Sequence, residues 1–337
     1  MRQWLCLALV AAWCALASQA KAEDSVTLRL SLDTAPSHVR NVALADYVKR
    51  LEDATGGRIK AQIFASAQLF GDRDVAKALR QGGIEMAAPG AWYLSSVAPN
   101  AGVLDTPIFF GRTLDAVHRV VDGPVGQKIN AEVEQKTGGK VLGRWLDLGS
   151  LNIYSTKRPI NTVADLDGLK LRSPGGVGMA LRAAAFGAIA NTTPWSDVPL
   201  ALSHGNFDAL VSTDETLTSG KLWEAGIKHA FVDREYPAFY IPVVSGEAWK
   251  KLKPDDQKLM INLWAENISG YRGLAREAQE KARASLDERG VVFVTPTEVE
   301  AEAARAKLSS FQDKFVQQLK LSPDIVDASK AALAATN

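Results

Sequence analysis

Cysteine is nearly absent from this chain of 337 residues, since Cys6 and Cys14 are its only two. Both lie in an N-terminal segment that starts with the basic MRQ, continues with the apolar run WLCLALVAAWCALA and ends with the small-x-small pattern of SQAKA. This order is typical of a secretory signal peptide, and we expect cleavage after residue 22. The mature chain then has no disulfide, no thiolate nucleophile and no cysteine-bound metal.

The sequence also lacks a second long apolar run and an excess of charge of either sign. The N-terminal run is too short for a transmembrane anchor, and neither cysteine follows the Leu-small-small of a lipoprotein signal. Removing Arg2 and Lys21 with the signal leaves 37 basic and 38 acidic residues, a net charge of −1. We therefore expect a periplasmic protein whose partner is neither nucleic acid nor an anionic membrane surface.

Motifs of catalysis and cofactor binding are missing as well. The chain contains no His-Glu-x-x-His, no Gly-x-Ser-x-Gly and no Walker-type loop, and the glycines at 175–178 lack dinucleotide-binding spacing. The four histidines are scattered and are interpreted as surface or packed residues: His38, His118, His204 and His229. We expect no cofactor, no metal and no enzymatic activity, although a dispersed catalytic triad stays open because triads are geometric.

Strand-like and helix-like patterns alternate through most of the chain. Two-residue alternation or short apolar runs predict strands at 26–32, 58–64, 84–88, 140–146, 169–172 and 207–212. Helical spacing lies between them, and Asp72 is expected to cap the helix that carries Val75 and Leu79. This order predicts parallel strands with helical crossovers in two α/β lobes, residues 23–147 and 148–235, the first completed by segments after about 236.

The C-terminal part is dominated by helical spacing. One long helix is expected from Pro254 to about Arg289, with a bend at Gly270. A late strand at 291–295 precedes a helix from Thr297 to about Leu319 and a last helix at 324–335. We expect these C-terminal helices, residues 254–337, to cross both lobes.

Six segments occur in an order and spacing that are found together in one known family. They are TGGRIKAQIFASAQLFGDRDVAKALRQGGIEMA, LDTPIFF, KRPINTVADLDGLKLRSPGG, TTPWSDVPLALSHGNFDAL, SGKLWEAG and IPVVSGEAWKKLKPDDQKLM. They resemble the DctP-like periplasmic solute-binding proteins of TRAP transporters over nearly the whole mature chain. The resemblance implies an α/β, two-lobed periplasmic binding protein fold, each lobe a mainly parallel sheet flanked by helices, with long C-terminal helices crossing both lobes.

Arg172 ends the short strand GLKLR just before the turn SPGG. The resemblance places it where the family has an arginine that forks onto a ligand carboxylate, and guanidinium presents two parallel donors that stay charged when water is excluded. The alternatives are a solvated strand-end arginine and one that bridges the lobes. A gapless count places Asn152 where several members have a second arginine, and Ser212 where many have asparagine. Losing that second cation favours a monocarboxylate over a dicarboxylate.

Further candidate ligand contacts each have a structural alternative. Trp195 can stack on the ligand or pack at the lobe edge, and Glu215 can accept a hydrogen bond or serve as a first-turn helix acid. Two aromatic pairs lie at a strand end or on an expected hinge strand, where they can line the ligand or the core. The pairs are Trp92 with Tyr93 and Phe239 with Tyr240, and Asp33 and His38 after the first strand are weaker candidates.

By the resemblance, the protein is expected to be an extracytoplasmic receptor. It would capture a small organic acid, such as a hydroxy, keto, aromatic or sugar acid, and deliver it to the small and large membrane permease subunits. We expect a monomer. A periplasmic enzyme with a dispersed triad, and a binding protein that serves a sensor instead of a permease, are the open alternatives.

Overall fold

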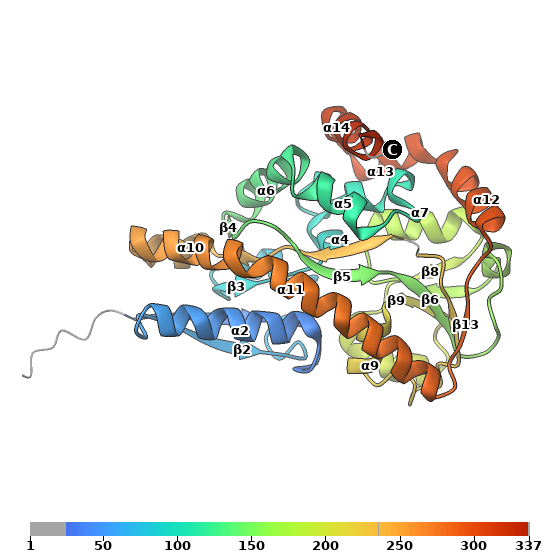
Figure 1. Ribbon diagram of the computed structural model, residues 1–337, viewed down its shortest axis with the longest axis horizontal. Helices are drawn as coiled ribbons and strands as arrows, with labels where there is room; N and C mark the ends of the chain where they lie inside the picture. Colours follow the sequence, from blue (N-terminus) through green and yellow to red (C-terminus); the bar gives the residue numbers. More distant parts are fainter. Residues whose placement is uncertain (1–24, 235, 336–337) are drawn as a thin grey trace, which may run out of the picture.

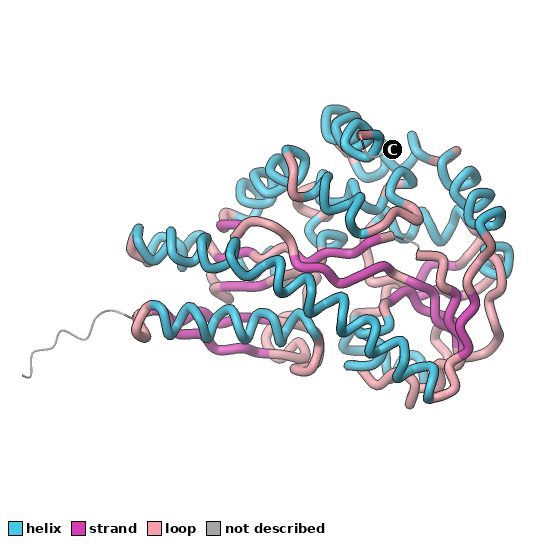
Figure 2. The backbone as a smooth tube through the Cα atoms, viewed as in Figure 1, coloured by secondary structure: helices cyan, strands magenta, loops and turns pink. Residues whose placement is uncertain are grey.

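Two large β-sheets lie at opposite ends of the long axis of the molecule, and a two-stranded ribbon joins them (Figure 1). The computed structural model describes residues 25–234 and 236–335. The expected signal peptide, residues 1–22, lies outside these described residues. Most strands lie between helices, whereas the edge strands β2, β8 and β13 are partly exposed (Figure 2).

The first sheet has five strands in the order β2-β1-β3-β12-β4. Their bounds are β1 Val26–Ser31, β2 Ile59–Phe64, β3 Met86–Ala87, β4 Lys140–Val141 and β12 Val243–Val244. Strand β1 pairs in parallel with β2 and β3, whereas β12 is antiparallel to β3 and β4. Leu28 and Leu30 are fully buried, because alternate residues of β1 face the core that helix α2 (Val39–Ala54) also joins.

The second sheet has six strands in the order β13-β10-β6-β9-β7-β8. Their bounds are β6 Asn152–Ser155, β7 Lys170–Arg172, β8 Ile189–Asn191, β9 Ala209–Ser212, β10 His229–Phe231 and β13 Val292–Val294. Strand β7 is parallel to β8 and β9, and β10 is parallel to β13, but β6 is antiparallel to both neighbours. Each sheet thus contains the predicted parallel pairs together with antiparallel pairs, which involve β12 and β6, the strands that directly follow the connecting ribbon.

The connecting ribbon consists of β5 (Leu146–Ser150) and β11 (Pro237–Tyr240), paired antiparallel with an irregularity between Ala238 and Phe239. Helix α11 (Pro254–Glu288) runs across the molecule and contacts α2 at one end and α9 (Asp214–Ser219) at the other (Figure 1). Its 35 residues make it about 52 Å long, enough to reach both sheets. The helix continues through Gly270.

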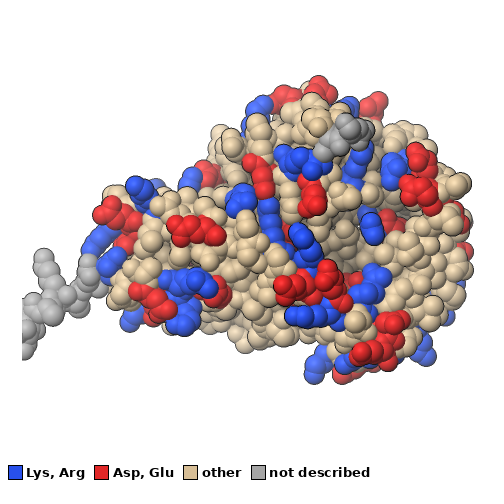
Figure 3. Space-filling view, in the orientation of Figure 1, with Lys and Arg blue, Asp and Glu red and all other residues tan. Residues whose placement is uncertain are grey.

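The remaining helices cover the sheets and the pocket described below. The α-helices are α3 Val75–Arg80, α4 Ala91–Leu94, α5 Leu114–Val121, α6 Pro124–Thr137, α7 Val177–Ala185, α8 Val198–Ser203, α10 Gly246–Lys251, α12 Glu298–Ser309, α13 Gln312–Leu319 and α14 Pro323–Ala334. The 3-10 helices are η1 Pro99–Asp105, η2 Pro107–Phe109, η3 Val163–Leu166 and η4 Trp195–Asp197. On the face drawn in Figure 3, basic and acidic side chains are interspersed.

Three predicted elements differ from the structure. The strand expected at 140–146 is divided into β4 and β5, and Gly143 between them has a φ of 133°, which a continuous strand does not allow. The helix expected from Thr297 to Leu319 is divided into α12 and α13 around Ser310 and Phe311. The N-cap position of α3 is Asp74 instead of Asp72.

The strands of the first sheet come from residues 26–141 and 243–244, and those of the second from 152–231 and 292–294. The lobe boundaries at 23–147 and 148–235 stay a prediction, and this distribution of strands is compatible with them.

Candidate functional site

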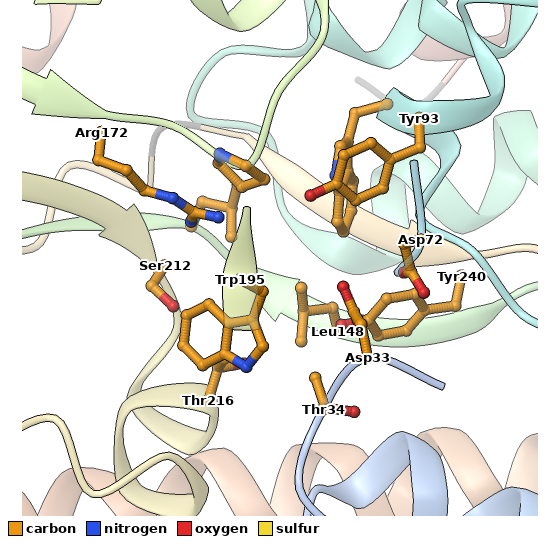
Figure 4. A pocket seen from close by; sticks show the side chains of 13 residues that line it. Asp33, Thr34, Asp72, Tyr93, Leu148, Arg172, Trp195, Ser212, Thr216 and Tyr240 are labelled. Carbon is orange, nitrogen blue, oxygen red and sulfur yellow. The ribbon is translucent and has the colours of Figure 1, made fainter. Parts of the chain in front are cut away.

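A narrow pocket of about 30 Å³ lies between the two sheets, beside the connecting ribbon (Figure 4). A cavity of this size holds about one or two water molecules, so a larger occupant requires the surrounding groups to move apart. The lining residues are Asp33, Thr34, Asp72, Trp92 and Tyr93 from the first half of the chain, Leu148, Leu151 and Tyr240 at the ribbon, and Arg172, Pro174, Trp195, Ser212 and Thr216 from the second sheet and its helices.

Arg172 is the last residue of β7, and its side chain points into the pocket (Figure 4). It is 1% exposed, its Nε donates to the carbonyl oxygen of Thr193 at 3.0 Å, and its guanidinium carbon lies 5.6 Å from the ring centre of Trp195. Among the described residues, no carboxylate lies within ion-pair distance of this guanidinium. Burial accordingly lowers the pKa of Arg172 to about 10. The site therefore holds a buried cation without a carboxylate in ion-pair contact among the described residues, although Asp33 lies across the same pocket, and this arrangement attracts an anionic ligand.

The turn after β7 brings the two lobes together. Gly176 has a φ of 87°, and a Cβ atom there would lie 3.0 Å from the carbonyl oxygen of Trp92. Nearby, Nη2 of Arg73 donates to the carbonyl oxygen of Thr192, which adds a second contact between the same walls. The glycine is needed both for its backbone conformation and for this close approach.

Hydroxyl groups line the same pocket as the guanidinium. The phenol of Tyr93 and the hydroxyl of Ser212 both line the pocket, and burial raises the pKa of Tyr93 to about 12, so this phenol stays protonated. The indole Nε1 of Trp92 is buried without a hydrogen bond among the described residues. The two hydroxyl groups can donate hydrogen bonds to a bound carboxylate together with Arg172, whereas the enclosed indole N–H of Trp92 does not reach the pocket surface.

The wall opposite Arg172 contains a second buried arginine with different surroundings. Arg40 donates from Nη2 to Asp33 Oδ1 at 2.6 Å and from Nη1 to Asp72 Oδ2 at 2.7 Å. Burial raises the pKa of Asp72 to about 7, although Arg40 acts in the opposite direction. The charge of Arg40 is thus balanced inside the protein, which leaves Arg172 as the pocket cation available to a ligand.

Helix α9 touches the start of helix α2 just outside the pocket. Oε1 of Glu215 accepts a hydrogen bond from the N–H of Val39 at 2.9 Å, and burial raises the pKa of Glu215 to about 7. Nδ1 of His38 accepts from the N–H of Arg40 at 3.1 Å, so its Nε2 carries the proton and faces Thr216 Oγ1 and Glu215 Oε2, each at 3.1 Å. Burial and the charge of Arg40 hold the pKa of His38 well below 6.5, and this contact is therefore not an ion pair.

The pocket brings together most of the residues predicted from the sequence. Those that line it are Arg172, Ser212, Trp195, Trp92, Tyr93, Tyr240 and the weaker candidate Asp33. Those that do not are Asn152, Glu215, Phe239 and the weaker candidate His38. Whether any of them touches a ligand stays a prediction.

Two of the predicted residues that lie outside the pocket are next to pocket residues in extended chain. Successive side chains of extended chain point to opposite sides. Leu151 lines the pocket, whereas Asn152 lines a separate crevice and accepts a hydrogen bond from the N–H of Arg234 at 3.3 Å. Tyr240 lines the pocket, whereas Phe239 is fully buried against Trp145, with 6.1 Å between ring centres. The structure thus places Asn152 and Phe239 outside this pocket, and their contact with a ligand stays a prediction.

Six lining residues were not among the predicted site residues. They are Thr34, Asp72, Leu148, Leu151, Pro174 and Thr216. Thr34 follows β1, and a systematic search of the residues after each strand would have found it, because ligands of such sheets bind beyond the carboxyl ends of strands. Asp72 looked like a helix cap, and only its distant partner Arg40 distinguishes it from one.

The described residues show neither a metal-binding cluster nor a membrane-spanning helix. No group of three or more His, Cys, Asp or Glu side chains within 25–234 and 236–335 is arranged to hold a metal ion. None of the helices in these ranges combines the length and apolar character that crossing a membrane requires.

Known proteins resemble this chain over nearly its whole length. The family model described as bacterial extracellular solute-binding protein, family 7 (DctP) matches residues 30–318. The 2,3-diketo-L-gulonate-binding periplasmic protein YiaO of Escherichia coli K12 is 26% identical over 302 residues, which cover 90% of either chain.

Solved structures support the same assignment of the fold. A TRAP periplasmic solute-binding protein from Sulfurospirillum deleyianum, with bound succinate, superposes with a TM-score of 0.84 at 24% identity and covers 91% of this chain and 98% of that chain. A second one, from Ralstonia eutropha H16 with bound (S)-2-hydroxy-2-methyl-3-oxobutanoate, gives a TM-score of 0.85 at 23% identity and covers 92% and 99%. The predicted two-lobed α/β fold is thereby confirmed. The chain belongs to bacterial extracellular solute-binding protein family 7, the DctP family of TRAP-transporter solute-binding proteins.

Proposed function

We propose that this protein captures a small organic acid in the pocket between its lobes, with Arg172 as the group that binds the carboxylate. The observation that carries the proposal is the burial of Arg172 without a carboxylate partner among the described residues. A bidentate pair with a ligand carboxylate would restore the missing charge and contribute on the order of 1.5–3 kcal/mol.

The ligands of similar proteins support an acid as the ligand. The relatives above are named or solved with a diketo sugar acid, succinate and a hydroxy-oxo acid. Each of these molecules carries at least one carboxylate. Arg172 is the one cation without a carboxylate partner among the described residues that line the pocket, and this favours a monocarboxylate for this chain.

The proposal includes the path of the ligand. The protein is secreted to the periplasm with a cleaved signal peptide, acts as a monomer, and delivers the acid to the small and large membrane subunits of a TRAP permease. Binding favours the closed arrangement of the lobes, because only that arrangement surrounds the ligand from both sides. The chain itself performs no chemistry on the acid, and a sensor as the receiving partner is the alternative to a permease.

A thermal-shift screen with hydroxy, keto, aromatic, amino and sugar acids tests this function. A binder is stabilised by its ligand in proportion to RT ln(1 + [L]/Kd), so at least one acid should raise the Tm while its mass spectrum stays unchanged. Conversion of the stabilising acid would instead support the enzyme alternative. If no acid in any class raised the Tm, the proposed function would be contradicted.

A further inference from the structure

The wall opposite Arg172 presents a carboxylate that the proposed function leaves unused. Asp33 comes two residues after the end of β1 and is 8% exposed. Figure 4 shows Asp33 and Arg172 on opposite sides of the pocket. The ring of Trp195 and the phenol of Tyr93 line the space between these two walls.

Asp33 has one oxygen that the described residues do not use. Its Oδ1 accepts from Nη2 of Arg40 at 2.6 Å, but Oδ2 has no hydrogen bond within residues 25–234 and 236–335. Oδ2 is not fully enclosed by the protein, so a ligand in the pocket can reach it. A carboxylate oxygen in this position accepts hydrogen bonds and donates none.

The charged groups behind this wall also favour a hydrogen-bond donor over an anion. Arg40 divides one positive charge between Asp33 and Asp72, with N···O distances of 2.6 and 2.7 Å. When both carboxylates are ionised, the three groups have a net negative charge. Asp72 is more fully enclosed than Asp33, because its side chain is 2% exposed and that of Asp33 is 9% exposed. The free acceptor of the group is therefore Oδ2 of Asp33.

We infer, on the basis of the proposed function, that the ligand is a bifunctional acid whose carboxylate binds Arg172 and whose other end donates a hydrogen bond to Asp33. The donor is a hydroxyl or an ammonium group, since both supply the hydrogen that Oδ2 accepts. A dicarboxylate is a poor ligand, because its second carboxylate would face Asp33 and like charges at short distance repel. Arg172 thus binds the carboxylate that all these acids share. Asp33 discriminates between them by the group at their other end.

Matched acids of equal chain length test this selection by calorimetry. Two sets each have a dicarboxylate, an ω-hydroxy acid and an ω-amino acid: succinate, 4-hydroxybutanoate and 4-aminobutanoate; and glutarate, 5-hydroxypentanoate and 5-aminopentanoate. A third set compares the dicarboxylate galactarate with the monocarboxylate galactonate. We expect the best donor acid of a set to bind at least about tenfold more tightly than its dicarboxylate. The hydroxy and amino members of the first two sets show which donor the site prefers.

The variant Asp33→Asn provides a second, mutational test of the role of Asp33. Its Oδ1 can still accept from Arg40, while an amide NH2 replaces Oδ2 and donates instead of accepting. We expect the donor-to-dicarboxylate preference to fall by at least about tenfold. Asp122→Asn is the matched control, because Asp122 pairs with the buried Arg272 at 2.7 Å outside the pocket and its loss should leave the preference within about twofold.

Three outcomes decide the inference. A wild-type protein that binds a dicarboxylate as tightly as its donor analogues overturns it, and so does an unchanged preference in a folded Asp33→Asn variant. The wild-type comparison stands alone if that variant fails to fold. Binding of no acid at all would contradict the proposed function itself, and is thereby distinguished from a failure of the role of Asp33.

Discussion

At the scale of single residues, the pocket contains two buried arginines in opposite electrostatic surroundings. Arg40 is matched by Asp33 and Asp72, whereas Arg172 has no carboxylate partner among the described residues. Burying a cation without a partner costs on the order of several kcal/mol, and a protein retains such a cost where a ligand supplies the missing charge. The proposed ligand-binding role of Arg172 and its effect on stability are therefore expected to be opposed.

Replacing Arg172 separates these two effects. In Arg172→Met, we expect the ligand-free protein to be as stable as the wild type or more so, because an apolar side chain of similar length removes the buried charge. The shift in Tm caused by a bound acid should disappear, and Arg172→Lys should retain only part of it, because the two-pronged contact is lost. Denaturant unfolding and thermal shifts measure both, with the exposed Arg50→Ala as control. Unchanged affinity in either variant would refute the assigned role.

Replacing Asn152 should affect ligand affinity much less than replacing Arg172. Its side chain lies in a crevice apart from the pocket, with its Oδ1 accepting from the N–H of Arg234. We therefore expect Asn152→Ala to change ligand affinity by less than about twofold, compared with a loss of about tenfold or more for Arg172→Ala. Calorimetry with the same acid compares them. A larger effect at Asn152 would mean that the binding pocket lies on the other side of β6.

At the scale of elements, the contact between α9 and the start of α2 depends on protonation. Burial raises the pKa of Glu215 from 4.5 to about 7, so between these values the folded protein binds more protons at this residue than the unfolded chain does. The free energy of unfolding then falls as pH rises through this range. A shift of this size corresponds to about 3 kcal/mol. The lowered pKa of His38 acts in the opposite direction, below pH 6.5.

Glu215→Gln tests this pH dependence. The amide oxygen can still accept from the N–H of Val39, but the side chain no longer becomes charged in its buried position. We expect the Tm of the variant relative to the wild type to increase from pH 5 to pH 8. Asp72, which titrates in the same direction, remains in both proteins and cancels in the comparison. A difference in Tm that stays constant with pH would show that Glu215 is not protonated in the folded protein near neutral pH.

At the scale of the whole molecule, the ribbon and helix α11 are the elements that join the two sheets. The pocket has contributions from both sheets and a volume of only about 30 Å³, so an acid of several carbons enters when the lobes separate. Two connecting strands and one long helix permit such a hinge motion. Ligand binding should then shift the molecule towards the closed arrangement.

Fluorescence energy transfer can follow this motion, because the expected mature chain has no cysteine of its own. Lys49→Cys on α2 and Lys157→Cys after β6 place labels on exposed positions, one near each sheet. We expect the distance between the labels to decrease when a binding acid is added and to stay unchanged in Arg172→Ala. A pair at Lys49 and Lys128, both within residues 23–147, is the control. Binding by calorimetry without any change in distance would contradict closure.

Local patterns in the sequence were sufficient for most elements and for the main candidate. The alternation of Leu28 and Leu30 predicted β1, and the SPGG turn after Arg172 marked the end of β7, because side-chain period and turn chemistry are properties of neighbouring residues. The family resemblance then singled out Arg172 among ordinary surface cations. Local pattern failed at Phe311, where the predicted helix divides, because no glycine or proline marks that break.

The sequence by itself determined the order of elements, the family, and Arg172 as the candidate cation. Only the tertiary structure decided which neighbours of Arg172 share the pocket, because Asp33, Asp72 and Thr216 are far apart in the chain and meet through folding. It also decided between Leu151 and Asn152, since a shift of one residue in extended chain moves a side chain to the other side. The charge balance of each buried arginine likewise depends on long-range contacts, and no local pattern records them.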